Sequence, residues 1–306
     1  MAERILITGA NGFIGRHALA ALVKGGAEVH ATARTVPNDA DVGRGGATWH
    51  RLDLLDAAAR ARLIEDVQAD TIVHFAWNVE HGKFWTTPEN LDWVGASLDL
   101  VRRGAETGCK RFVGLGTCFE YAPQTTDDCD ERTTPLSPHL LYGVAKDATR
   151  RVIEEFARQH SLSWAWGRFF LLYGPDETPT RLVPQVAQRV LRGEPAPIGT
   201  LERPRDFMDT RDAGAATAAL ALSNVEGPVN IATGAAASVR TVAETLARLA
   251  GHPDLVRVGA FPDRDEPERI VARVDRLTTE VGFRDIRPLE QGLAQALDWW
   301  RAKAAG

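Results

Sequence analysis

Short apolar runs alternate with longer amphipathic stretches along the first half of this chain. The short runs have the length and composition of buried strands: Arg4–Thr8, Glu28–Ala33, Thr48–Asp53, Thr71–Phe75, Arg111–Thr117 and Ser163–Phe169. The stretches between them show helical periodicity: Gly15–Lys24, Ala57–Gln68, Glu89–Thr107 and Tyr142–His160. Strands that alternate with helices pair in parallel through right-handed crossovers. The sequence therefore predicts an α/β fold with a doubly wound parallel sheet.

The sequence changes character after residue 175, where prolines become frequent. The elements expected in this part are three helices and a short strand: Leu182–Leu191, Pro228–Ile231, Ser238–Ala250 and Leu289–Ala302. We interpret residues 175–205 and 235–306 as a smaller C-terminal lobe, and residues 1–174, with about 206–234, as the sheet domain. Ligands of open α/β sheets bind in the crevice at the carboxyl edge of the strands, where this lobe would lie.

Charge and cysteine content exclude several functional classes. A net charge of −5 argues against a nonspecific nucleic-acid binder. The three cysteines have no metal-ligand spacing, so we expect free thiols, no metal site and a reducing compartment. Neither a signal peptide nor an apolar run of membrane-spanning length is visible. We therefore expect a cytoplasmic enzyme without a membrane partner.

Three glycines spaced three residues apart follow the first expected strand and open the first helix. Glycine is needed where the backbone turns sharply and where it must approach a phosphate closely. A helix N-terminus adds free N–H groups and a partial positive charge. We therefore expect a dinucleotide-binding loop made of Gly9, Asn11, Gly12, Phe13, Ile14 and Gly15.

This glycine spacing, with Phe13-Ile14 before the last glycine, resembles the extended short-chain dehydrogenase/reductase family, of the NAD-dependent epimerase/dehydratase type. Further landmarks of that family extend the resemblance from residue 4 to about residue 300: Tyr142–Lys146, Arg205–Asp209, Asn230–Gly234 and Leu289–Leu293. The nucleotide-sugar 4-ketoreductases of the family resemble the chain most. The resemblance implies a Rossmann-like dinucleotide-binding domain followed by a substrate-binding lobe.

The end of the second expected strand bears on the choice of cofactor. An acidic residue there would bind the adenosine ribose 2′-hydroxyl and select NAD. Here the strand ends in Thr32-Ala33-Arg34-Thr35, without a carboxylate. Arg34 could pair with a 2′-phosphate, so we favour NADP(H) over NAD(H), although Arg34 could also be an ordinary surface residue.

The resemblance implies further cofactor contacts. Asp53 and Leu54 match positions that hold the adenine, Phe75 and Ala76 match positions that line the cofactor backbone, and Phe170 matches a residue beside the nicotinamide. Two positions depart from the family pattern, because Asp92 and Leu171 each replace an asparagine. We therefore expect a changed active-site water network near the former and a variant substrate pocket near the latter.

Tyr142 and Lys146 are the expected catalytic pair. Their spacing of four residues places both on one helix face. Tyrosine has an ordinary pKa near 10. A neighbouring ammonium and the positive nicotinamide would lower that pKa, so that Tyr142 can exchange a proton with the substrate oxygen while hydride moves. The resemblance adds that Lys146 binds the nicotinamide ribose and that Thr117 hydrogen-bonds the reacting oxygen.

The residues that follow Thr117 bear on the reaction. In the resembling 4,6-dehydratases this threonine is followed by Asp-Glu, which eliminates water by acid/base catalysis. Here the two positions are Cys118 and Phe119, so we expect no dehydration. Both are expected to border the substrate, and we interpret Cys118 as a small buried apolar residue. Glu120 could contact substrate hydroxyls, act as a base or have a structural role.

The expected substrate is a nucleotide-diphosphate sugar. Arg181 and Arg205 are the candidate diphosphate ligands, because a guanidinium offers a fixed bidentate fork. Each could instead form a surface ion pair. Trp77 follows the fourth expected strand together with His81 and Trp85, where a sugar or base could stack and where lid packing is the alternative.

Three functions remain open at this stage. The first is an NADP-dependent reductase of a 4-keto group on a nucleotide-linked deoxysugar, favoured by the expected cofactor. The second is an NAD-dependent nucleotide-sugar 4-epimerase. The third is a non-catalytic module that senses a dinucleotide, which has no need of Thr117, Tyr142 and Lys146 together. The resemblance also implies a homodimer, in which Glu89–Thr107 and the helix that bears Tyr142 pair across a two-fold axis as a four-helix bundle.

Overall fold

A seven-stranded sheet forms the centre of the computed structural model, which describes residues 3–35, 46–123, 126–199, 202–261 and 267–305. All its strand pairs are parallel, and the strand order is β10-β6-β5-β4-β1-β2-β3. The bounds are β1 Arg4–Thr8, β2 Glu28–Ala33, β3 Ala47–Arg51, β4 Thr71–His74, β5 Arg111–Thr117, β6 Ser163–Phe169 and β10 Gly227–Ile231. The expected doubly wound α/β fold is confirmed.

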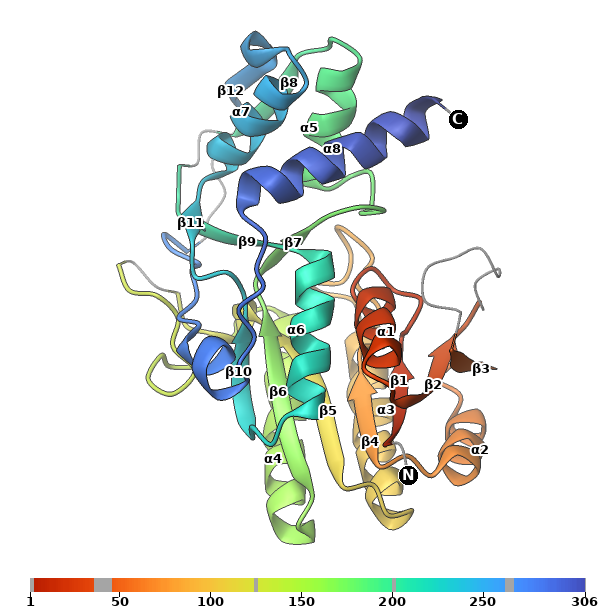
Figure 1. Cartoon of the computed structure of the whole chain (residues 1–306). Helices are drawn as coiled ribbons and strands as arrows, with labels where there is room; N and C mark the ends of the chain where they lie inside the picture. The colour runs from red at the N-terminus through yellow and green to blue at the C-terminus, as the bar shows by residue number, and fades with distance from the viewer. Residues whose placement is uncertain (1–2, 36–45, 124–125, 200–201, 262–266, 306) are drawn as a thin grey trace.

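Both faces of the sheet are covered, so its inner strands β1, β4, β5 and β6 are buried at nearly every position. Successive side chains of a strand point to opposite faces. In β1, Ile5 and Ile7 therefore join one core, while Leu6 joins the other. The first core includes α1 and α6, and the second includes α2, α3 and α4 (Figure 1). The helix bounds are α1 Gly15–Lys24, α2 Ala57–Val67, α3 Glu89–Glu106, α4 Leu141–His160 and α6 Thr210–Leu222.

A smaller lobe lies beyond one end of the sheet and has its own apolar core (Figure 1). Its helices are α5 Leu182–Leu191, α7 Val239–Leu249 and α8 Leu289–Ala305, with the short turn η2 Pro253–Leu255. The short turn η3 Arg276–Glu280 instead packs against β10, and its Leu277 belongs to the first core. Two small sheets complete the lobe, from β7 Leu171–Tyr173, β8 Ala196–Gly199, β9 Arg205–Asp209, β11 Ala236–Ala237 and β12 Val256–Phe261. No helix among the described residues is both long and apolar enough to cross a membrane.

Helix α6 ties the lobe to the glycine loop. The Asp209 side chain caps α6 by accepting from the Arg211 N–H, and the Thr210 hydroxyl donates to the carbonyl of Phe13 at 2.8 Å. A Cβ on Gly214 would lie 2.7 Å from the backbone nitrogen of Ala18, so α6 and α1 touch through small residues. The first turn of α6 therefore helps to hold the glycine loop in position.

Candidate active site

The glycine loop between β1 and α1 is wound too tightly for side chains at its three glycines. Gly9 has φ +66°, and a Cβ there would lie 2.8 Å from the nitrogen of Ala76. A Cβ on Gly12 would lie 3.1 Å from the Gly9 carbonyl oxygen, and one on Gly15 would overlap that oxygen. Ile14, which precedes α1, provides no side-chain cap, and the N–H groups of Arg16, His17 and Ala18 donate to the carbonyls of Gly12 and Ile14. A phosphate would therefore meet the N–H groups of Phe13, Ile14 and Gly15 at the positive end of α1. The loop therefore fits the expected dinucleotide.

The outer part of the loop is accessible and carries positive charge. Asn11 and Gly12 are exposed, while Phe13 and Ile14 are half-buried. Arg16 donates to the carbonyl oxygens of Gly12 and Asn11, and it also pairs with Asp176 at 2.5 Å. A guanidinium beside the N-terminus of α1 adds to the attraction for an anion.

The expected adenosine contacts lie at the ends of two neighbouring strands. Arg34 is exposed directly after β2, and its carbonyl accepts from Arg51 at 3.3 Å. Asp53 is also exposed, and its carboxylate accepts from the Leu55 N–H at 3.0 Å, while Leu54 is buried. Strand β3 ends at Arg51, two residues earlier than expected, so Asp53 stands in the following turn. The choice between NADP and NAD remains a prediction.

A buried hydrogen-bond chain supports the middle of the expected cofactor site. The Ser97 hydroxyl donates to the Trp93 carbonyl at 2.7 Å and therefore accepts from His74 Nε2 at 2.8 Å. His74 Nδ1 then accepts from the Thr8 hydroxyl at 2.8 Å, and Thr8 accepts from the Ala76 N–H at 3.2 Å. Burial, and secondly the charge of Lys146, lowers the pKa of His74 to about 3, so the ring is neutral.

These hydrogen bonds hold the segment after β4 against Gly9. Strand β4 ends at His74, one residue before the expected end. Phe75 and Ala76 therefore lie in the turn beyond it, half-buried, and the Phe75 ring stacks on Phe169 with centroids 6.4 Å apart. His74 was not among the expected site residues. The apolar strand around this histidine does not indicate that its ring is neutral and hydrogen-bonded on both nitrogens.

The three expected catalytic residues are all buried. Thr117 ends β5 and is 6% exposed, and its hydroxyl oxygen accepts from the Phe119 N–H at 3.3 Å. Tyr142 and Lys146 lie in the first turns of α4, 8% and 5% exposed. The Lys146 ammonium lies 5.9 Å from the centroid of the Tyr142 ring. Burial lowers the pKa of Lys146 to about 7, and the carboxylate of Glu120 opposes this effect.

The pKa of Tyr142 moves in the opposite direction to the one expected. Burial first, and the Glu120 carboxylate second, raises the pKa of this phenol above its ordinary range, while Arg181 opposes them. The phenol oxygen is far from water, so its charged form loses solvation. Tyr142 therefore stays protonated at neutral pH.

Three aromatic rings from the segment after β4 enclose Tyr142. Phe84 meets its ring edge-on with centroids 4.8 Å apart, and Trp85 and Trp77 do so at 5.9 and 6.4 Å. The Tyr142 N–H also donates to the Trp85 carbonyl at 3.1 Å. In contrast, His81 is exposed. The segment is thus a wall of the site.

Trp77 does not offer a free face for a sugar or base. One face carries the Lys146 ammonium 3.8 Å from the ring centroid, and the Trp93 ring stacks on Trp77 with centroids 6.2 Å apart. Its Nε1 donates to the Asn90 side-chain oxygen at 2.9 Å. Because these contacts occupy the ring, they favour the packing alternative for Trp77 over stacking on substrate.

Glu120 has a structural role. Its side chain is fully buried, and Oε2 pairs with Arg168 Nε at 2.7 Å. Its Oε1 accepts from Trp166 Nε1 at 3.0 Å and from the Thr117 N–H at 3.1 Å. Both carboxylate oxygens therefore face the protein interior, which favours the structural alternative over a substrate contact. Glu120 instead fixes the backbone of Thr117.

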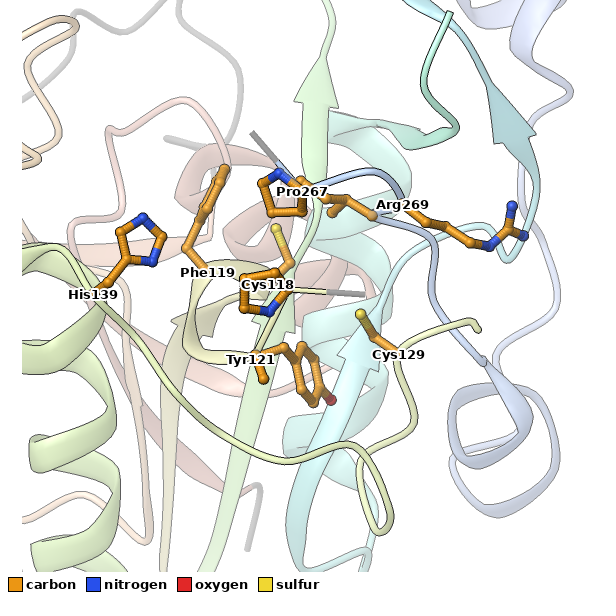
Figure 2. A pocket seen from close by; sticks show the side chains of 10 residues that line it. Cys118, Phe119, Tyr121, Cys129, His139, Pro267 and Arg269 are labelled. Carbon is orange, nitrogen blue, oxygen red and sulfur yellow. The ribbon is translucent and has the colours of Figure 1, made fainter. Parts of the chain in front are cut away.

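A pocket opens beside the residue that follows Thr117 (Figure 2). It encloses about 330 Å³ of empty space, part of which is open solvent. Cys118 and Phe119 line it together with His139 from the loop before α4 and with Ile270 and Arg269 from the lobe. Burial raises the pKa of the Cys118 thiol far above its ordinary range, so the thiol is neutral as expected. The lining is mostly apolar.

Phe170 and Leu171 lie where the sheet domain passes into the lobe. Phe170 is 6% exposed and packs in one apolar cluster with Cys118, Tyr121 and Ile270. Leu171 begins β7 and is half-buried against the same cluster. At this position the departure from the family asparagine supplies an apolar side chain to this cluster.

Arg181 lies near Glu177, a glutamate that was not among the expected site residues. Arg181 is half-buried at the N-terminus of α5. Glu177 is 5% exposed, and its Oε2 has no hydrogen-bond partner among the described residues. Burial raises the pKa of Glu177 to about 8, and Arg181 opposes this effect. A glutamate in a proline-rich loop is ordinarily expected to be exposed to solvent. The sequence around Glu177 therefore does not indicate that this side chain is buried.

Arg205 and Asp92 also differ from expectation. Arg205 is 3% exposed, and it donates to the carbonyls of Pro204, Pro267 and Glu268 at 3.0, 2.9 and 3.4 Å. The guanidinium therefore holds a backbone segment instead of facing outward as a diphosphate ligand. Asp92 is exposed on α3, away from any water network in the interior. In the described parts of the chain, no three His, Cys, Asp or Glu side chains gather as metal ligands would.

Comparisons with known proteins agree with this geometry. A dTDP-glucose 4,6-dehydratase from Xanthomonas campestris pv. campestris is 25% identical, over 96% of this chain and 92% of the relative. The dTDP-6-deoxy-L-talose 4-dehydrogenase (NAD(P)(+)) from Kitasatospora kifunensis is 28% identical, over 87% and 85%. A solved UDP-glucose 4-epimerase from Thermus thermophilus, in complex with NAD, superposes with a TM-score of 0.85 and 25% identity, over 97% and 99%.

The first three quarters of the chain identify the family. The glycine loop, the strand ends and the tyrosine–lysine pair all lie within residues 5–232, which match the family model described as the NAD dependent epimerase/dehydratase family. Since the match covers most of the chain and the fold agrees over its whole length, this protein belongs to the NAD-dependent epimerase/dehydratase family.

Proposed function

We propose that this protein is a reductase that transfers hydride from NADPH to the 4-keto group of a nucleotide-linked deoxysugar. The observation that carries the proposal is the chemistry directly beyond Thr117. Cys118 is a buried neutral thiol, Phe119 cannot exchange protons, and Glu120 is held by Arg168. This segment therefore lacks a free acid/base pair of the kind that elimination of water needs.

The protonation of Tyr142 supports reduction. A ketone that receives hydride at carbon needs a proton at oxygen, and a phenol with a raised pKa holds that proton at neutral pH. In the proposed reaction Tyr142 gives its proton to the carbonyl oxygen, while the hydroxyl of Thr117 hydrogen-bonds the same oxygen. The bound nicotinamide supplies the hydride, so that the ketone gains one hydride and one proton and becomes an alcohol.

Lys146 would orient the cofactor in this reaction. Its Nζ donates to the Leu115 carbonyl at 2.9 Å, which ties the ammonium to β5. An ammonium has three donors, so donors remain for the ribose of the nicotinamide. NADPH is proposed because Arg34 stands exposed where a 2′-phosphate would lie, and the Kitasatospora relative is named for both NAD and NADP.

A nucleotide-sugar 4-epimerase that uses NAD is the second candidate. It is favoured by the likeness to the Thermus thermophilus UDP-glucose 4-epimerase with NAD over nearly the whole chain. An epimerase must remove and return hydride within one turnover, so it consumes no cofactor. The two functions therefore differ in whether reduced nicotinamide disappears.

The deciding experiment follows reduced nicotinamide with dTDP-, GDP-, UDP- and CDP-linked 4-keto-6-deoxyhexoses, each with NADPH and with NADH. We expect NADPH to be oxidised with at least one of them. If no keto sugar causes oxidation, or if only NADH is used, the reductase proposal is wrong in its substrate or its cofactor. Interconversion of the 4-hydroxyl epimers of a UDP-hexose without loss of reduced cofactor would establish the epimerase.

We also propose that the protein is a homodimer through α3 and α4. These helices pack side by side on one face of the sheet. They expose large apolar side chains to solvent, with Leu91 62%, Val144 43% and Val152 50% exposed. A second copy of the same two helices would cover them as a four-helix bundle.

A further inference from the structure

The face of the Trp77 indole carries the ammonium of Lys146. The Lys146 Nζ lies 3.8 Å from the ring centroid, and the lysine side chain is buried. A cation over the face of tryptophan is attracted by the ring quadrupole, and the attraction strengthens where water is excluded. We propose that Trp77 is a positioning residue, which holds the Lys146 ammonium in place and keeps it charged for the chemistry at Tyr142.

The indole is itself held in one orientation. Its Nε1 donates to the side-chain oxygen of Asn90 at 2.9 Å. The Asn90 amide nitrogen donates to the carbonyls of Phe84 and Thr87 at 2.8 and 2.9 Å, which turns its oxygen toward Trp77. The Trp93 ring packs against Trp77. The contact with Lys146 is therefore built into the wall of the site.

Few other groups keep Lys146 charged. Of the charged or titratable side chains around it, Glu120 on η1 (Cys118–Glu120) attracts the ammonium but is already paired with Arg168. His74 on β4 is neutral, and Tyr142 on α4 is protonated. Burial lowers the Lys146 pKa to about 7 even though the Glu120 carboxylate opposes the shift, so the charge of Lys146 is easily lost near neutral pH. The indole face opposes that loss.

The charge matters because of its two uses in the proposed reaction. A charged Lys146 attracts the electron density that forms on Tyr142 when its proton leaves. A charged lysine also has three donors instead of two for the Leu115 carbonyl and the ribose. The inference thus rests on the proposed role of Lys146 in hydride transfer, but the charge of Lys146 can be measured without turnover.

The direct test is a pH titration of Lys146 by ¹H–¹³C NMR in protein labelled with ¹³C-lysine, with the signal assigned by its loss in Lys146→Met. In Trp77→Leu, which has no ring face, we expect the titration midpoint to fall by about one pH unit. In Trp77→Phe, which keeps a weaker face, we expect a smaller fall. An unchanged midpoint in both variants overturns the inference.

A matched control separates the charge effect from loss of packing. Leu63→Ala removes a buried side chain of the same cluster from α2 and leaves Asn90 and Trp93, which orient Trp77, unchanged, so we expect it to lower stability while the Lys146 midpoint stays within a few tenths of a pH unit. An equal fall of the midpoint in Leu63→Ala would overturn the specific role of Trp77. Because the titration needs no substrate, it gives the same answer whether the reductase proposal stands or fails.

Discussion

The carboxylate of Glu120 and the guanidinium of Arg168 form an ion pair of 2.7 Å in which both side chains are out of contact with solvent. The pair lies directly behind Thr117, whose N–H also donates to Glu120. Arg168 Nη2 is buried without a partner among the described residues, so its charge depends heavily on this one carboxylate. Removing one partner of a buried pair leaves an uncompensated charge in the interior.

Glu120→Gln is therefore expected to lower the free energy of unfolding by about 3–5 kcal/mol. Urea unfolding followed by fluorescence measures it. Glu155→Gln is the control, because Glu155 forms an exposed pair with Arg158 on α4 and its loss should change stability little. Similar values for the two variants would show that the Glu120–Arg168 pair contributes no more than a surface pair does.

Tyr142→Phe is expected to lower kcat by about 10²–10⁴-fold, because the variant cannot donate the proton that the carbonyl oxygen needs. Cofactor affinity should change little, since the ring and its aromatic contacts remain. Single-turnover oxidation of NADPH measures the first quantity, and quenching of tryptophan fluorescence measures the second. Retention of turnover at the wild-type rate would remove Tyr142 from the mechanism.

Arg34→Ala tests the cofactor preference. If Arg34 pairs with the 2′-phosphate, its loss removes a charge-assisted hydrogen bond worth about 1.5–3 kcal/mol. We expect kcat/KM for NADPH to fall about tenfold or more, since 1.4 kcal/mol corresponds to a factor of ten. The value for NADH in the same variant is the internal control and should stay unchanged. A parallel fall for both cofactors would assign Arg34 a structural role.

The dimer proposal predicts that a charge on α4 separates the subunits. Val152→Arg places a cation on the expected two-fold interface, and we expect a shift from dimer to monomer in sedimentation velocity. Val258→Arg is the matched control, because Val258 is similarly exposed on β12 in the lobe and should leave the dimer intact. A wild-type monomer at micromolar concentration would refute the proposal directly.

Glu177 predicts a pH dependence of stability. Its folded-state pKa is raised to about 8, above an ordinary value near 4.3, so the folded state binds the extra proton between these values. Stability should therefore fall as pH rises through this window. In Glu177→Gln we expect that slope to disappear, and at pH 9 the variant should be more stable than wild type by at least about 1 kcal/mol. Thermal melts at pH 5 and pH 9 measure the difference, and equal slopes would contradict it.

Much of the fold could be predicted from the sequence, because the local residue pattern of most strands matches the environment in which the strand is buried. Strands β1, β2, β5 and β6 have the expected bounds, because the strands of a parallel sheet covered on both faces are rich in apolar residues. Helix α6 was not anticipated. Its residues are small and mostly buried, and a helix buried on several sides has no polar face to mark its period.

The sequence by itself determined the doubly wound sheet, the glycine loop and the tyrosine–lysine pair, because each depends on spacing along one strand, turn or helix. Only the tertiary structure decided which way polar side chains face. Glu120 turned inward to Arg168, Arg205 to backbone carbonyls and Trp77 to Lys146. These partners lie on other elements of the chain, and the energy of a buried charge depends on the groups folded around it.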